Sequence, residues 1–149
     1  MLLQKDEFSC GVFAVANALR CFGINAKEFE VRRYSNTTKN GTDENGVLRA
    51  LEHFGLSPLP FTFTNKKEAI KYLRSSLKVG FPAIICVNNW KHWSLANGIL
   101  GERFVITDSS NSKRNQRELG CRVIDEKTLL KLWSCNSGEF YGIICCRSK

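Results

Sequence analysis

The chain has few histidines and lacks the cysteine spacing of zinc sites. It contains only two histidines, His53 and His92, in 149 residues, and none of its seven cysteines forms a Cys-x-x-Cys pair. Structural zinc sites draw four Cys or His ligands from closely spaced pairs, so we expect neither a metal nor another cofactor. An odd number of cysteines also disfavours a disulfide framework. We expect most of them to be small core residues in a reducing cytoplasm, as for Cys21, Cys86, Cys145 and Cys146.

Long hydrophobic runs are also missing. The longest clearly apolar stretches, residues 83–87 and 143–146, fall well short of the roughly 20 residues that cross a bilayer. Residues 1–7 are too few and too polar for a secretory signal peptide. The composition, with 43% hydrophobic and 24% charged residues, is that of an ordinary globular protein. We expect one soluble cytoplasmic domain over residues 1–149.

Acidic residues are fewer than basic ones, which leaves a net charge of +8. Such a charge can attract nucleic acid, an anionic surface or an acidic partner. The basic residues are scattered along the chain, however, and aromatic residues do not interleave with them as a stacking platform for single strands requires. We interpret the charge as a solvated basic surface and expect no nucleic-acid partner.

The hydrophobic pattern predicts helices first and strands afterwards. Apolar residues recur at helical spacing over 10–22 on nearly every face, which indicates a buried central helix with Ser9 as N-cap and Gly23 as its end. Pro58 and Pro60 are assigned to a loop. The order indicates an α+β fold, with N-terminal helices packed on a mainly antiparallel sheet. The other predicted helices are 26–34, a segment from Thr42 or Asp43 to 54, 65–77 and 126–133, and the predicted strands are 61–64, 83–87, 93–100, 104–107, 123–124 and 140–146.

Cys10 stands at the start of the predicted central helix. Unpaired N–H groups and the positive end of the helix dipole favour a thiolate there. A neighbouring imidazolium can lower the pKa of a cysteine, ordinarily about 8.5, by several units further. Taken alone, a cysteine in this setting can equally be a buried structural residue, so the nucleophile hypothesis depends on a nearby base.

His92 is the better placed of the two histidines to act as that base. It lies just after a predicted buried strand and at the start of a predicted hairpin, whereas His53 lies in a helix beside an apolar stripe. A cysteine nucleophile needs a base that is adjacent in space and not in sequence. The alternative for His92 is a packed structural histidine whose ring is satisfied by its neighbours.

An imidazole base needs an orienting group, and Asp108 is the first candidate. If the hairpin loop centres on Gly101, position 94 faces position 108. His92 is then the diagonal neighbour of Asp108 on one face, about 7–8 Å away by backbone and within side-chain reach. A one-residue slip in register would place the two on opposite faces. Asn111 is the second candidate, because a neutral amide can also hold an imidazole.

The negative charge that develops on a substrate carbonyl needs hydrogen-bond donors. The backbone N–H of Cys10 at the helix start provides one. Gln4, which precedes Cys10 by six positions, can place its side-chain amide alongside as the second. Loss of one such donor typically costs about 2.7–4 kcal/mol of transition-state stabilisation.

The combination of Gln4, Cys10-Gly11, His92 and Asp108 resembles the bacteriocin-processing (double-glycine leader) peptidases of the papain-like superfamily. Residues 41–55, with Gly-Thr followed by a helix, and the strand at 104–108 are also similar to that family, and the likeness covers essentially the whole chain. The resemblance implies a papain-like fold whose central helix opens at the nucleophile, and peptide cleavage in the cytoplasm without a metal. It also implies Cys10 as nucleophile, His92 as base, Asp108 as orienting residue and Gln4 as oxyanion donor.

Three features depart from the family pattern. Ser9 stands where the family usually has Asp before its cysteine, and Ser109 stands where a proline commonly follows the aspartate. The transmembrane and ATPase domains that usually follow the peptidase domain are not present, so we expect a stand-alone enzyme that acts on a peptide or protein and can associate with a separate transporter or precursor.

The sequence thus predicts a cysteine peptidase, with processing of a leader peptide after Gly-Gly as the most specific form. Related thiol chemistry remains the alternative: an amidase, a hydrolase of ubiquitin-like tails or an acyltransferase. A peptide-binding module without turnover belongs to another class. Retention of Cys10 argues against that last interpretation.

Overall fold

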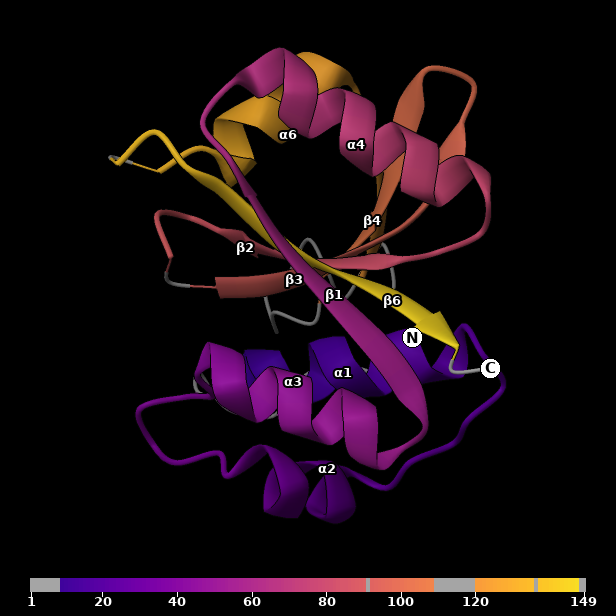
Figure 1. Ribbon diagram of the computed structural model, residues 1–149, viewed down its shortest axis with the longest axis vertical. Coiled ribbons are helices and arrows are strands. Elements are labelled where there is room, and N and C mark those ends of the chain that lie inside the picture. Colours follow the sequence, from indigo (N-terminus) through magenta and orange to yellow (C-terminus); the bar gives the residue numbers. More distant parts are fainter. Residues whose placement is uncertain (1–8, 91, 109–119, 136, 148–149) are drawn as a thin grey trace.

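The computed structural model describes residues 9–90, 92–108, 120–135 and 137–147. A six-stranded antiparallel sheet in the order β1-β6-β2-β3-β4-β5 separates two layers of helices (Figure 1). Five helices lie within the described residues, three on one face of the sheet and two on the other. The α+β prediction is confirmed. The strands are β1 (Leu56–Phe63), β2 (Ala83–Val87), β3 (His92–Leu100), β4 (Arg103–Thr107), β5 (Cys121–Ile124) and β6 (Phe140–Arg147).

The central helix α1 (Cys10–Arg20) packs against β3 and β2. Ten of its eleven residues are buried, as the lack of a polar face predicted. The helix ends at Arg20, two residues before the predicted end, and Gly23 then takes a φ of 74° in the turn that follows. The neighbouring helices α2 (Glu28–Ser35) and α3 (Glu44–His53) complete this layer.

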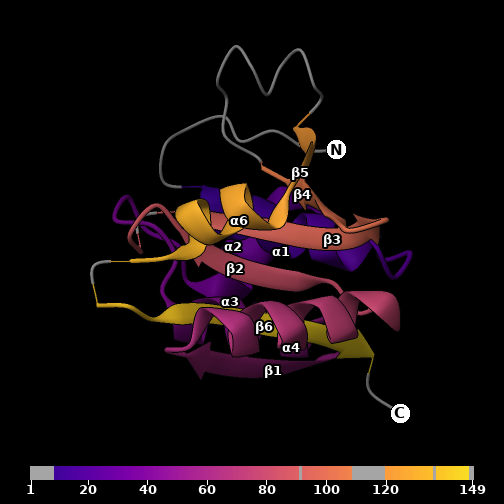
Figure 2. The ribbon, with the colours of Figure 1, turned by 90° about the horizontal axis from the view of Figure 1, so that it is seen from above.

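Two amphipathic helices cover the opposite face of the sheet (Figure 2). In α4 (Lys66–Lys78) the side chain of Asn65 accepts a hydrogen bond from the Glu68 N–H at 3.1 Å. In α6 (Glu126–Trp133) Asp125 accepts from the Thr128 N–H at 2.8 Å in the same way. Both caps satisfy N–H groups that a helix start leaves unpaired, so these two helices begin where their sequences provide an acceptor.

The first strand corrects the prediction of a loop around Pro58 and Pro60. Both prolines lie inside β1, which pairs only with β6 and forms one edge of the sheet. Positions 58 and 60 are two residues apart, so their backbone nitrogens point to the same side of the strand. On an edge strand that side can be the unpaired one, where a missing N–H costs no ladder hydrogen bond.

Candidate active site

Cys10 is the first residue of α1, and the residue is 7% exposed. The first hydrogen bond of the helix runs from the Phe13 N–H to the Ser9 carbonyl at 3.0 Å. The N–H groups that precede Phe13 in the helix therefore have no acceptor inside it and point out of its N-terminal end, beside the thiol. Gly11 is required for packing here, because a Cβ atom on it would lie 2.7 Å from the Cβ of Thr42.

Ser9 is the N-cap residue of α1, as predicted, but its side chain makes no capping hydrogen bond. Its hydroxyl instead accepts a hydrogen bond from Nη2 of Arg32, which also donates to Oε1 of Glu28 at 3.0 Å. Ser9 is fully buried. The α2 helix thus anchors the residue directly before the candidate nucleophile through a charged side chain.

His92 is the first residue of β3 and follows an unusual stretch of backbone. Asn88, Asn89 and Trp90 have φ values of 53°, 58° and 70°. Asparagine tolerates this left-handed region, but tryptophan rarely adopts it, so the approach to His92 holds local strain. The ring of Trp90 lies 5.4 Å from that of Tyr141 in β6. Strain of this kind is typical of functional sites.

His92 and Asp108 are in direct contact. Nε2 of His92 donates to Oδ1 of Asp108 at 2.7 Å, and the two side chains are only 14% and 13% exposed. The predicted contact is therefore confirmed. A second charge is present, because Nη2 of Arg122 in β5 lies 3.9 Å from Oδ2 of the same carboxylate. The sequence did not suggest Arg122, and nothing in its local pattern distinguishes it from other strand residues.

The His92–Asp108 contact forms in a different way from the predicted one. The hairpin turns at Gly101-Glu102, with Leu100 opposite Arg103, so the loop is not centred on Gly101. A β-bulge between Ala96 and Gly98 then shifts the register by one residue. The shift restores the pairing that was expected near the site.

Burial raises the pKa of the Cys10 thiol, but its hydrogen bond with His92 and the N–H groups of Trp93 and Gly11 outweigh this, so the pKa is lowered overall. Burial would lower the pKa of His92, whereas hydrogen bonds to Asp108 and Cys10 raise it to about 9. Near neutral pH these directions favour a thiolate beside an imidazolium. Nε2 contacts Asp108, so the other ring nitrogen, Nδ1, is the one left for Cys10.

The remaining candidate site residues do not take part in the described contacts of the site. Gln4 and Asn111 lie outside the described residues. His53, the rejected base, stacks on the ring of Tyr34 with centroids 3.3 Å apart. His53 therefore has a packing role at the end of α3.

The remaining cysteines fit the core prediction only in part. Cys86 and Cys145 are buried, and burial raises the pKa of each to about 12. Cys21 is exposed, which corrects its assignment to the core, because α1 ends one residue earlier. Slight burial raises the pKa of Cys135, but its hydrogen bonds with Ser137 and with the backbone lower it overall. Cys135 is thus a second thiol that any labelling experiment must separate from Cys10. Within the described residues, no group of three or more His, Cys, Asp or Glu side chains could hold a metal.

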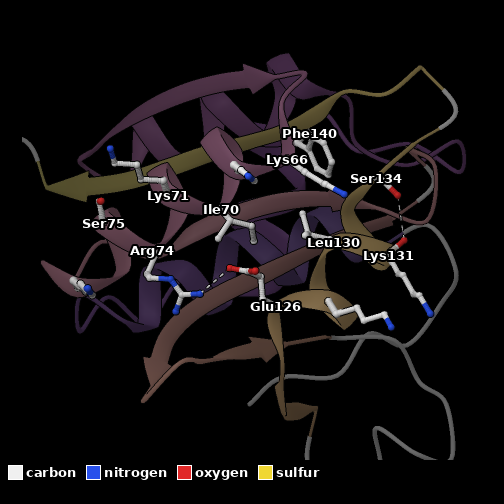
Figure 3. A pocket seen from close by; sticks show the side chains of 13 residues that line it. Lys66, Ile70, Lys71, Arg74, Ser75, Glu126, Leu130, Lys131, Ser134 and Phe140 are labelled. Atoms are coloured by element: carbon white, nitrogen blue, oxygen red, sulfur yellow. Dashed lines mark hydrogen bonds and ion pairs between the residues drawn. The ribbon is translucent and has the colours of Figure 1, made fainter.

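A basic groove lies between α4 and α6, on the far side of the sheet from α1 (Figure 3). Arg74 pairs with Glu126 at 3.1 Å across it, above an apolar floor that includes Ile70 and Leu130. Neither a thiol nor an imidazole lines this groove. It is therefore separate from the candidate active site, although it gathers lysines that are far apart in the sequence: Lys66, Lys67, Lys71, Lys78, Lys127 and Lys131.

Comparison with known proteins supports the papain-like fold. A model of the Peptidase C39 family matches residues 1–134. A double-glycine motif protease from an AMS/PCAT transporter, solved with its leader peptide, is 19% identical with a TM-score of 0.77, over 99% of this chain and 91% of that chain. The peptidase domain of ComA from Streptococcus, a bi-functional ABC transporter of a quorum-sensing pathway, is 16% identical with a TM-score of 0.72, over 99% and 97%.

A third solved structure has the same fold. The peptidase C39-like domain of a toxin secretion ATP-binding protein from Vibrio parahaemolyticus is 15% identical with a TM-score of 0.62, over 97% of this chain and 99% of that chain. No curated protein sequence matches the chain significantly. Of the helices described, none has the length and apolar character needed to span a membrane.

Proposed function

The chain belongs to the peptidase C39 family of cysteine peptidases, and on that premise we propose that Cys10, His92 and Asp108 are its catalytic residues. One observation carries the proposal: Nε2 of His92 lies 2.7 Å from Oδ1 of Asp108. The interaction of His92 with Cys10, which lowers the pKa of the thiol and raises that of the imidazole, supports it. A nucleophile, a base and an orienting carboxylate in this relation make up the machinery of acyl transfer.

In the first half of the reaction, the Cys10 thiolate attacks the carbonyl carbon of the scissile peptide bond. The C=O electron pair moves onto oxygen and forms a tetrahedral oxyanion. When this collapses, the C–N bond breaks and His92 gives its Nδ1 proton to the departing amine. The product that remains is a thioester between Cys10 and the acyl half of the substrate.

In the second half, water cleaves the thioester. Neutral His92 takes a proton from the water, whose oxygen attacks the thioester carbonyl, and the thiolate of Cys10 leaves as the carboxylic product forms. Asp108 holds the ring in one tautomer and stabilises the imidazolium each time it appears. The nearby positive charge of Arg122, 3.9 Å from Oδ2, acts on this carboxylate as well.

The oxyanion requires donors at the start of α1. The backbone N–H of Cys10 lies in the first turn, where helix geometry leaves it without an acceptor inside the helix. We assign the second donor to the side-chain amide of Gln4, on the resemblance to the family. Two donors aimed at one oxygen stabilise the charge in the transition state more than in the bound substrate.

We further propose that the substrate is a peptide cleaved after Gly-Gly, in a reducing cytoplasm where free thiols persist. The support is family membership and one structural relative that was solved with a leader peptide. A small precursor that carries a Gly-Gly leader is the partner this predicts, with a separate transporter as a second.

Two measurements test the proposal. Iodoacetamide near pH 6, followed by peptide mapping, should label Cys10 faster than the other six cysteines, with Cys135 resolved separately. Incubation with a peptide library that includes Gly-Gly leaders should show cleavage by mass spectrometry. His92→Gln should abolish cleavage, whereas the matched change His53→Gln should leave it intact.

Each result has a defined meaning. Slow labelling of Cys10 would exclude thiolate catalysis altogether. Fast labelling without peptide cleavage would redirect the assignment to an amidase, a hydrolase of ubiquitin-like tails or an acyltransferase. Cleavage at sites without glycine would retain the peptidase and remove the double-glycine substrate.

A further inference from the structure

The β3–β4 hairpin changes register between its turn and the proposed catalytic pair. Next to the turn, Leu100 lies opposite Arg103 and Gly98 opposite Val105. Continuing that pairing without interruption would bring Leu95 opposite Asp108. In the structure Leu95 lies opposite Thr107, because the bulge between Ala96 and Gly98 takes up one extra residue. That residue is Asn97.

The extra residue decides on which face of the sheet Asp108 lies. Residues directly opposite each other share a face, and faces alternate along a strand. With Leu95 opposite Thr107, the next position places Ser94 opposite Asp108, so His92 shares a face with Asp108. Without the shift, Asp108 would share the face of Leu95, and His92 would point to the other side.

A side-chain hydrogen bond spans the bulge. Oγ1 of Thr107 donates to Oδ1 of Asn97 at 3.0 Å. Thr107 is only 2% exposed and directly precedes Asp108, so its hydroxyl needs a protein partner. With Leu95 opposite Thr107, Asn97 is the diagonal neighbour of Thr107 on the same face, where its side-chain oxygen can accept this bond. In the regular register Thr107 would lie opposite Ala96, which has no side-chain acceptor.

We propose that Asn97 and Thr107 are positioning residues of the peptidase: their hydrogen bond selects the bulged register in which Asp108 faces His92. This role rests on the proposed function, because it acts through the base and its orienting carboxylate. The charged and titratable groups described around this contact include Cys10 from α1 and Cys86 from β2, beside His92, and Arg122 from β5, beside Asp108. Bulges beside active sites commonly direct a side chain in this way.

The direct test is an NMR titration of His92, which is simple to assign because the only other histidine can be replaced in His53→Gln. Thr107→Val removes the donor and keeps the shape, and should lower the pKa of His92. Thr107→Ser retains the hydroxyl and should keep the wild-type pKa. Thr62→Val, on the exposed side of β1, is the matched control and should change nothing.

Changes at Asn97 distinguish a role in selecting the strand register from a role in filling space. Asn97→Val keeps the extra residue but removes the acceptor, and should shift the pKa of His92 as Thr107→Val does. Deletion of Asn97 leaves a regular hairpin in which Ala96 still faces Ile106 and Gly98 still faces Val105. The deletion should therefore preserve the His92–Asp108 contact. If Asn97 matters only by filling space, the deletion should be the more damaging change.

The catalytic effect is measured as the hydrolysis of a peptide that the wild-type enzyme cleaves. Thr107→Val should lower kcat/KM about three- to tenfold, which corresponds to the free energy of one hydrogen bond. KM should stay unchanged, and the alkaline limb of the pH profile should move to lower pH. In an Asp108→Ala background the same change should have no further effect. Two outcomes would overturn the positioning role alone. One is an additive loss of kcat/KM when Thr107→Val is combined with Asp108→Ala. The other is an unchanged pKa of His92 in both Thr107→Val and Asn97→Val while Cys10 stays reactive. An unreactive Cys10 in the wild type would overturn the proposed function instead.

Discussion

Replacing Asp108 with alanine removes the carboxylate that accepts the hydrogen bond from His92 at 2.7 Å. Both side chains are largely shielded from water, at 14% and 13% exposed, so solvent screens the interaction little. A hydrogen bond to a charged group contributes about 1.5–3 kcal/mol. One pKa unit corresponds to 1.36 kcal/mol, which makes this about 1–2 units. The pKa of His92, raised to about 9, should therefore fall to between about 7 and 8.

The measurement is again the NMR titration of His92, paired with the pH dependence of peptide hydrolysis. Leaving-group protonation needs the imidazolium, so the alkaline limb of kcat/KM should move downward with the pKa. Asp108→Asn, which keeps a hydrogen-bonding oxygen and loses the charge, should fall between wild type and Asp108→Ala. A His92 pKa that stays near 9 in Asp108→Ala would refute the reasoning, because Cys10 alone would then account for the shift.

Three further predictions follow from the site and its supports. Gly11→Ala should destabilise the fold by about 1–3 kcal/mol in urea unfolding, because the new Cβ would lie 2.7 Å from the Cβ of Thr42; an unchanged midpoint would contradict this. Arg32→Met removes the donor to Ser9 and should slow alkylation of Cys10 at pH 6, whereas Arg33→Met, the neighbouring cation, should not. The pKa of His92 is raised on folding, so the difference in unfolding free energy between wild type and His92→Gln should be largest below pH 6.5 and shrink as the pH rises through about 9. A difference that instead grows toward alkaline pH would contradict that assignment.

Local patterns predicted the helices well. The stripe of Ala69, Ile70, Leu73 and Leu77 gave α4 within one residue at each end, because an amphipathic helix repeats its apolar positions over several turns. The first strand was only half found. Pro58 and Pro60 normally exclude a strand, and they are tolerated here because β1 lies at the edge of the sheet. No local pattern in the sequence indicates that a strand will lie at the edge of the sheet.

The hairpin shows a different limit of sequence reasoning. The contact of His92 with Asp108 was predicted and is present, but the assumed loop centre was wrong by half a residue step. The bulge at Asn97 shifts the register by one residue, so the pairing near the site is nevertheless the predicted one. An extra residue shifts the alternation of faces by one position, but four consecutive residues of β3, from Trp93 to Ala96, are buried, so the strand has no polar–apolar alternation in which the shift could be seen.

Which residue types could carry thiol chemistry was decided by the sequence itself. Cys10 at a helix start and a single well-placed histidine follow from composition and from patterns a few residues long. Whether these groups meet was decided only by the tertiary structure. The contact of His92 with Asp108 joins residues 16 positions apart, and Arg122 joins them from another strand. Such contacts depend on strand register and sheet order, which arise from pairing and packing across the whole molecule and leave no periodic mark on the chain.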